Sequence, residues 1–168
     1  KLLNEIIPLY KRLHEAGRIE LAVSPYFHPI LPLLCDTQMA REAMPKVTLP
    51  QERLRHPEDA KAHICNGLRY FQEVFGITPR GMWPSEGSVS DEAVRLIREC
   101  GLEWIATDEE VLARSLDGGL GEHHERLYRP WRYSTAHGDL GIFFRDHQLS
   151  DLIGFTYGGR YGLHELVS

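Results

Sequence analysis

The chain has 168 residues, of which 42% are hydrophobic and 26% are charged. This composition is that of a globular domain and excludes a disordered, collagen-like or coiled-coil protein. The 19 Lys and Arg residues against 24 Asp and Glu residues give a net charge of −5. We therefore expect no nucleic acid partner, because a phosphate-binding surface needs an excess of positive charge. We expect no membrane partner either, since no apolar run approaches the roughly 18 to 20 residues of a membrane span.

The cysteines bear on the compartment. Cys35, Cys65 and Cys100 form no C-x-x-C pair, and their number is odd. A disulfide framework or a structural zinc site is therefore not expected. The N-terminal segment lacks the continuous apolar stretch of a signal peptide. Reduced thiols in a cytoplasmic protein are the simplest interpretation.

In the first third of the chain, a helix and a strand are followed by irregular segments. Leucine and isoleucine at helical spacing predict an amphipathic helix over residues 2–16, ended by Gly17. Residues 19–23 are predicted to form a short strand. Residues 24–32 carry three prolines and are predicted to begin as a loop. Residues 40–56 are expected to be irregular.

In the rest of the chain, helices and strands alternate. A helix is predicted from Pro57, with acidic residues in its first turn, to Gly76. The later expected elements are a strand at 81–83, a helix at 91–100 capped by Ser90, a strand at 103–107, a helix at 109–116, and strands at 128–134 and 140–145. This alternation predicts an α/β fold with mainly parallel strands flanked by helices. Four or five strands suffice for a small sheet or an arc of a barrel, but not for an eight-stranded barrel.

Polar side chains follow three of the predicted strands, where catalytic groups gather in parallel α/β folds. The segment 83–90 is the most informative, because Glu86 follows Trp83 and a proline and precedes a glycine and two serines. A positioned carboxylate can serve as the nucleophile of a retaining glycosidase, and the indole of Trp83 offers a face for a sugar ring. Alternatively, Glu86 lies in the first turn of a helix and complements its dipole.

Each of the other candidates also has a structural interpretation. Asp108 is either a second carboxylate or the N-cap of the helix that follows it. Glu20 lies among apolar neighbours in a predicted strand, where an unpaired charge is unfavourable, so it belongs either to the site or to a polar network. His28 either contacts a sugar hydroxyl or is held between aromatic residues and a proline. The segment Arg145-Asp146-His147 ends a strand, where an internal salt bridge and a substrate contact are both open.

Other catalytic classes lack their motifs. No G-x-S-x-G segment indicates a Ser/His/Asp hydrolase, and no glycine-rich loop has the spacing of a phosphate site. The adjacent side chains of His123 and His124 cannot face one metal ion from regular structure. We therefore expect neither a metal site nor an organic cofactor.

Five blocks of sequence are informative in their order. They are Gly17-Arg18-Ile19-Glu20-Leu21, residues 24–34 (SPYFHPILPLL), residues 83–90 (WPSEGSVS), residues 101–109 (GLEWIATDE) and residues 143–151 (FFRDHQLSD). Together they resemble glycoside hydrolase family 57, which comprises α-glucan-active amylases, branching enzymes, pullulanases and 4-α-glucanotransferases. Residues 83–90 are similar to the family's third conserved region, and Glu86 matches the position of its nucleophile.

The resemblance implies a fold and also shows two departures. The family fold is a seven-stranded β/α barrel, so residues 1–168 would form an incomplete (β/α)7-type barrel, the central part of a catalytic domain. The family's His-Gln-Pro strand is missing, and so is the Asp-Gly-Glu-like segment that holds its general acid/base. Asp108 does not match the acid/base position, so we take it as a neighbour of the site.

The resemblance further implies a retaining α-glucan hydrolase or transglycosylase that acts through a covalent glycosyl-enzyme intermediate. Its partner would be an α-glucan or maltooligosaccharide substrate, with Glu86 as the catalytic residue and no cofactor. The chain alone is predicted to be inactive for want of the acid/base. The predicted substrate-binding residues are Glu20, Tyr26, His28, Trp83, Asp108, Arg145 and Asp146.

Two alternatives remain open at this point. One is a metal-dependent polysaccharide deacetylase on a related barrel, which needs a His/His/Asp metal cluster. The other is a non-catalytic carbohydrate-binding remnant, in which Trp83, Trp104 and Tyr26 hold a glucan without cleaving it.

Overall fold

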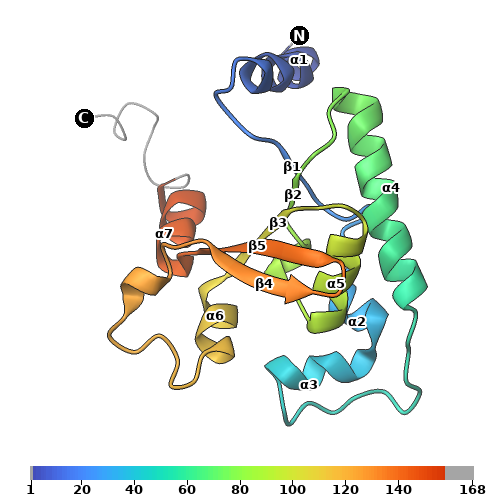
Figure 1. Cartoon of the computed structure of the whole chain (residues 1–168), viewed down its shortest axis with the longest axis vertical. Coiled ribbons are helices and arrows are strands. Elements are labelled where there is room, and N and C mark those ends of the chain that lie inside the picture. The colour runs from blue at the N-terminus through green and yellow to red at the C-terminus, as the bar shows by residue number, and fades with distance from the viewer. Residues whose placement is uncertain (1, 158–168) are drawn as a thin grey trace.

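The computed structural model describes residues 2–157. Figure 1 shows one sheet, with α4 and α5 on one side in this view and α6 and α7 on the other. The helices are α1 (Leu2–Glu15), α2 (Leu31–Cys35), α3 (Ala40–Ala43), α4 (Pro57–Phe75), α5 (Asp91–Glu99), α6 (Glu109–Ser115) and α7 (His147–Asp151). Shorter helical turns are η1 (Thr37–Met39), η2 (Ser85–Gly87), η3 (His124–Arg126) and η4 (Leu152–Tyr157). The strands are β1 (Ala22–Val23), β2 (Gly81–Met82), β3 (Trp104–Asp108), β4 (Trp131–Thr135) and β5 (Gly138–Arg145).

The five strands form one sheet in the order β1-β2-β3-β5-β4. The first four strands in this order pair in parallel, and only the β4–β5 hairpin is antiparallel. The carboxyl ends of the parallel strands therefore lie at one edge of the sheet, which we call the carboxyl edge. Asp108 and Arg145 are direct neighbours there, since they are register partners at the ends of β3 and β5.

The main core lies between the sheet and the layer formed by α2, α4 and α5. It contains the fully buried side chains Leu31, Ile64, Met82, Ile97 and Ile105. Burial of each such side chain stabilises the fold by about 1.5–3 kcal/mol relative to exposure. A smaller cluster of Leu112, Leu120 and Leu127 packs against Trp131 of β4 and Phe144 of β5.

The predicted fold class is confirmed: the sheet is mainly parallel and helices flank it. The helix starts follow their local signals. Pro57 begins α4 with Glu58 and Asp59 in its first turn, where the helix dipole favours negative charge. Ser90 caps α5 by accepting a hydrogen bond from the backbone N–H of Ala93. Among residues 2–157, none of the helices is long and apolar enough to cross a membrane.

Three local predictions were wrong. The strand expected over residues 128–134 is β4 and begins only at Trp131, directly after Pro130. The strand expected over residues 19–23 covers only Ala22–Val23, because its partner β2 has two residues and Pro79 and Pro25 bound the paired region. Glu20 therefore lies outside the strand and is exposed. The segment 40–56, expected to be irregular, begins with the helical turn α3.

Candidate active site

Glu86 is presented by a tight turn directly after β2. Its backbone is left-handed, with φ 55° and ψ 21°, which is unfavourable for a residue with a Cβ atom. A hydrogen bond from β3 holds the turn in place. Oγ1 of the buried Thr107 donates to the carbonyl oxygen of Gly87 at 2.5 Å. Gly87 is also left-handed (φ 66°), and a Cβ at this position would lie 3.2 Å from the Trp83 ring. Packing against β3 and Trp83 thus forces the Glu86 side chain outward.

The Glu86 carboxylate is exposed and contacts one histidine. Oε1 of Glu86 lies 3.3 Å from Nε2 of His28, and their side chains are 74% and 47% exposed. His28 (φ 54°) and the preceding Phe27 (φ 60°) are left-handed too, and these two with Glu86 are the non-glycine residues with positive φ in the described chain. Strained backbone of this kind is concentrated at functional sites in proteins. The structure brings two of the predicted site residues, His28 and Glu86, together.

Asp108 ends β3 next to this turn and is held by three hydrogen bonds. Its carboxylate accepts from the backbone N–H of Glu110 at 3.1 Å and from Nε of Arg145 at 2.7 Å, and it lies 3.1 Å from Nδ1 of His147. Asp108 is thus an N-cap, as one of the two interpretations of the sequence predicted, and at the same time the centre of an ionic cluster. Burial alone would raise the pKa of Asp108, but the three hydrogen bonds together lower it below its usual value.

His147 completes the cluster and joins it to the next helix. Nε2 of His147 lies 3.2 Å from Oδ2 of Asp151, so its two ring nitrogens face two carboxylates. The hydrogen bond to Asp108 first, and then the charge of Asp151, raise the pKa of His147 above its ordinary 6.5. The cluster therefore joins Arg145 and His147 to one partly buried carboxylate.

A cleft of about 490 Å³ opens at the carboxyl edge and collects these groups. This volume lies within the range of about 300–1,000 Å³ that is usual for ligand sites. Its polar lining includes Glu86, Asp108, Arg145 and His147. Its apolar lining comes mostly from α2, α3 and the segment before α5, and includes Ile30, Leu33, Met39, Met44, Val89 and Val111. Charged side chains thus line one part of the cleft and apolar side chains line another.

Trp83 packs against two residues of the cleft lining, Arg145 and Gly87. The guanidinium carbon of Arg145 lies 5.6 Å from the centre of the Trp83 ring, which is a cation–π contact. Arg145 thereby connects Trp83 to Asp108. The Trp83 indole is half-buried and contacts the predicted site through Gly87 and Arg145.

Of the predicted substrate-binding residues, only Asp108 and Arg145 line the cleft. His28 and Trp83 contact residues of its lining, whereas Asp146 and Tyr26 have other partners. Asp146 caps α7 by accepting from the backbone N–H of Leu149 at 2.8 Å and accepts a hydrogen bond of 2.6 Å from the Tyr128 hydroxyl. Tyr26 packs its ring on Phe27 and lines a separate apolar pocket with residues of α4. Both side chains have structural partners that explain their positions.

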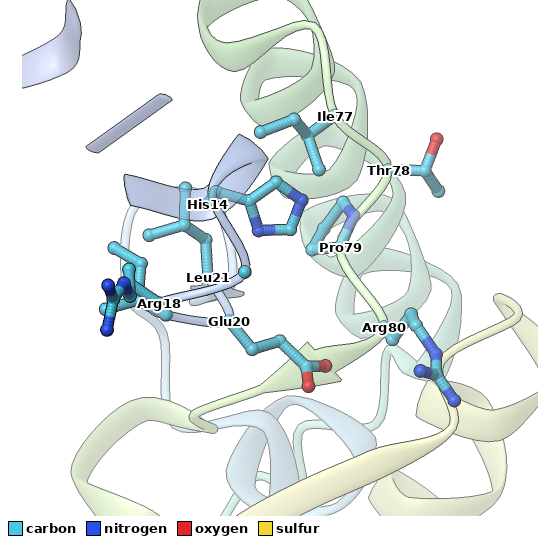
Figure 2. A pocket seen from close by; sticks show the side chains of 10 residues that line it. His14, Arg18, Glu20, Leu21, Ile77, Thr78, Pro79 and Arg80 are labelled. Atoms are coloured by element: carbon cyan, nitrogen blue, oxygen red, sulfur yellow. The ribbon is translucent and has the colours of Figure 1, made fainter. Parts of the chain in front are cut away.

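The structure does not bring Glu20 to the other candidates. Glu20 precedes β1 and lines a pocket of about 440 Å³ at the opposite, amino edge of the sheet, together with His14, Arg18 and Arg80. Figure 2 shows the Glu20 side chain extending toward the segment that carries Arg80. Its carboxylate accepts a hydrogen bond of 2.9 Å from the Trp104 indole, so Glu20 belongs to a polar network, the second of its two interpretations.

Two further observations concern the alternatives. In the part of the chain that the structure describes, no three His, Cys, Asp or Glu side chains are grouped closely enough to hold a metal ion. The deacetylase alternative therefore has no metal cluster within residues 2–157. The Trp104 indole packs against Gly81: a Cβ atom added to Gly81 would lie 2.0 Å from the ring. This packing holds the indole over the sheet near Glu20.

Comparison with known families decides the classification. The model of glycosyl hydrolase family 57 matches residues 1–166. The chain belongs to this family. The alpha-amylase of Pyrococcus horikoshii is 28% identical over 153 residues, which are 90% of this chain and 20% of that protein. The 4-alpha-glucanotransferase of Thermococcus litoralis is 26% identical over 153 residues, which are 90% of this chain and 19% of that protein. The chain thus spans about a fifth of the length of these curated relatives.

Solved structures of family 57 proteins share the fold. The alpha-amylase AmyC from Thermotoga maritima superimposes with a TM-score of 0.61 at 22% identity, covering 88% of this chain and 24% of that one. The GH57-type branching enzyme from Pyrococcus horikoshii gives a TM-score of 0.58 at 20% identity, covering 91% and 26%. The family 57 chain described here therefore has the α/β, incomplete-barrel architecture that its sequence predicted.

Two features of the cleft were not in the predicted set of substrate-binding residues. His147 belongs to the candidate segment 145–147, but only Arg145 and Asp146 of that segment were predicted to bind substrate. Met44, in the segment expected to be irregular, and Met39, just before it, also line the cleft. No local signal marks these methionines, because their role depends on how α3 folds over the carboxyl edge.

Proposed function

We propose that this family 57 chain provides the nucleophile half of an α-glucan hydrolase or transferase. Glu86 is the nucleophile that attacks the anomeric carbon of an α-linked glucan and forms a covalent glycosyl-enzyme intermediate. The observation that carries this proposal is the position of Glu86: an exposed carboxylate on a strained turn, at the mouth of a cleft on the carboxyl edge.

The neighbours of Glu86 have different roles in this proposal. His28 lies within reach of the carboxylate and orients it toward the cleft. Arg145 and His147 place positive charge beside the path of the substrate, where they can hold sugar hydroxyl groups. The apolar wall of the cleft suits the carbon face of a glucose ring. The α-glucan substrate is inferred from relatives that are named alpha-amylase and 4-alpha-glucanotransferase.

The general acid/base is proposed to come from outside this chain. Asp108 is poorly suited to that role, because three hydrogen bonds hold it ionised with a lowered pKa, whereas a general acid must carry a proton near neutral pH. Retaining chemistry needs a second carboxyl group about 5–5.5 Å from the nucleophile. We therefore expect the chain by itself to be inactive on glucans.

Trapping of the intermediate tests the proposal. The protein that contains this chain together with its acid/base segment would be incubated with a fluorinated α-glucosyl fluoride, which slows the second chemical step. Peptide mass spectrometry should find one glycosyl group on Glu86. A label on another carboxylate, or the opposite anomer as the first product of maltooligosaccharide cleavage, would remove Glu86 as nucleophile.

A binding experiment separates the non-catalytic alternative. If the same protein binds maltooligosaccharide but releases no product with any acceptor, the chain is a carbohydrate-binding module and the proposal fails. Glu73→Gln is a suitable control in both experiments, because Glu73 is an exposed residue of α4 outside the cleft lining.

A further inference from the structure

Two cysteines that are far apart in the sequence meet on the helical layer. Sγ of Cys65, on α4, lies 3.2 Å from Sγ of Cys100, the residue that ends α5. The two residues are 35 positions apart, and neither forms a disulfide in this structure. A disulfide requires the sulfur atoms to approach to about 2.05 Å, so a shift of roughly an ångström would join them.

The two thiols differ in accessibility. Cys65 is exposed, whereas Cys100 is half-buried. Burial first, and then the hydrogen bond with Cys65, raise the pKa of Cys100 to about 12. The third cysteine, Cys35, is buried in the core, where burial raises its pKa to about 11. Of the three thiols, only that of Cys65 is therefore exposed enough to react first with a molecule in solution.

A charged pair lies beside the two thiols. Lys61 lies one helical turn before Cys65 on α4, so the two side chains share a face. The Lys61 ammonium is 2.7 Å from Glu99, which precedes Cys100. The two thiols therefore lie in a polar part of the helical layer.

We propose that Cys65 and Cys100 form a redox-active dithiol that is oxidised to an intrachain disulfide by low-molecular-weight disulfides. The Cys65 sulfur attacks one sulfur of glutathione disulfide, which forms a mixed disulfide and releases one glutathione thiolate. The Cys100 thiol then loses its proton to solvent as its sulfur attacks the Cys65 sulfur, and the second glutathione leaves as a thiolate. Two protein thiols lose two electrons and two protons, and one glutathione disulfide becomes two glutathione thiols.

The disulfide would tie α4 to α5, two helices that adjoin segments of the candidate site. Helix α4 holds the loop before His28, since Nδ1 of His63 lies 2.5 Å from the Tyr26 carbonyl oxygen. Helix α5 follows the Glu86 turn within a few residues. Cross-linking them constrains the unfolded chain, so the oxidised form should melt roughly 5–15 °C higher than the reduced form.

Peptide mapping in glutathione buffers tests this proposal. The reduced protein would be equilibrated near pH 8 with mixtures of glutathione and glutathione disulfide, then alkylated and digested. We expect a peptide pair linked through Cys65 and Cys100 to grow with the proportion of glutathione disulfide, while Cys35 is alkylated only after denaturation. A stable glutathione adduct on Cys65 without the linked pair, or a link to Cys35, would overturn the proposal.

Single substitutions test the order of the two steps. Cys100→Ser should trap glutathione on Cys65, because the second thiol is missing. Cys65→Ser should leave Cys100 unmodified at the same reagent concentration. Cys35→Ala is the control and should form the linked pair as the unsubstituted protein does. Equal glutathione labelling of Cys65→Ser and Cys100→Ser would contradict the assigned order and the proposed site.

Discussion

Each of the two edges of the sheet carries a pocket with at least one carboxylate in its lining, yet the two pockets differ in kind. At the amino edge, Glu20 is bound to the Trp104 indole, and Arg80 donates two hydrogen bonds to Glu103. At the carboxyl edge, Glu86 stands exposed on a strained turn with one long contact to His28. A pocket with a carboxylate is therefore not by itself a catalytic site.

The difference follows from how each carboxylate is positioned. Glu20 lies before its strand, where it reaches a ring that packs flat on Gly81. Glu86 follows β2, where its left-handed backbone directs the side chain away from the sheet and toward the cleft. At the carboxyl edge the backbone of Glu86 is strained and its carboxylate is exposed. At the amino edge, Glu20 and Glu103 have hydrogen-bonding partners. The following predictions test this contrast.

The largest effect is expected from the two glutamates themselves. In the protein that also holds the acid/base, Glu86→Gln should lower kcat on maltooligosaccharide by on the order of 10³-fold or more, because the amide cannot form the covalent intermediate. Glu20→Gln should change kcat by less than about threefold, since the amide still accepts from Trp104. Comparable losses for both variants would remove the distinction between the edges.

A matched pair of glycines tests the role of the turn. Gly17 and Gly87 have almost the same φ, 65° and 66°, but only Gly87 has a neighbour, the Trp83 ring, in the way of a Cβ. Gly17→Ala should lower the free energy of unfolding by about 1–2 kcal/mol through the left-handed backbone alone. Gly87→Ala should lower it further and should reduce kcat about tenfold or more, because the turn that aims Glu86 must shift. Chemical denaturation and activity assays measure the two effects, and equal stability losses would show that the contact with Trp83 is unimportant.

The ionic cluster provides the next test. Asp108→Asn keeps an N-cap oxygen but removes the charge that holds Arg145 and His147. We expect the free energy of unfolding to fall by about 1–3 kcal/mol, the usual loss when charged partners are left unpaired. Glu73→Gln, which affects only an exposed pair with Arg69 at 3.9 Å, should change it by less than about 0.5 kcal/mol. A loss for Asp108→Asn as small as for the control would show that the cluster is only a surface feature.

The smallest effect concerns pH. The pKa of His147 is raised in the folded state above its ordinary 6.5, so protonated His147 stabilises the fold fully below about pH 6.5. That contribution is lost as pH rises through the folded-state pKa. NMR titration of the His147 ring should show the raised pKa, and Asp108→Asn should bring it closer to the ordinary value. A titration unchanged by Asp108→Asn would mean that Asp108 is not the main cause.

Several parts of the fold could be predicted because their signals are local. The start of α4 at Pro57 depends on a fixed φ and on acidic residues within one turn, and the cap of α5 depends on the Ser90 hydroxyl three residues from its donor. The limits of β1 could not be predicted, because strand length depends on its partner β2. The block around Glu86 indicated the candidate nucleophile, but not its left-handed backbone.

In the candidate site, too, local contacts could be predicted and long-range contacts could not. One of the two interpretations of Asp108, the N-cap, is confirmed and is a contact over two residues. Its bonds to Arg145 and His147 join residues 37 and 39 positions apart. The odd number of cysteines predicted no disulfide framework, and nothing in the spacing of Cys65 and Cys100 indicated that their sulfur atoms lie 3.2 Å apart.

What the amino-acid sequence determined by itself is thus the order of helices and strands, the caps and the membership of family 57. These follow from interactions within a few residues or from blocks preserved in order. Only the tertiary structure decided which carboxylates share an edge of the sheet, which are already paired, and which thiols meet. The physical reason is that pairing of parallel strands and packing of helices bring together groups whose separation along the chain carries no information about their distance in space.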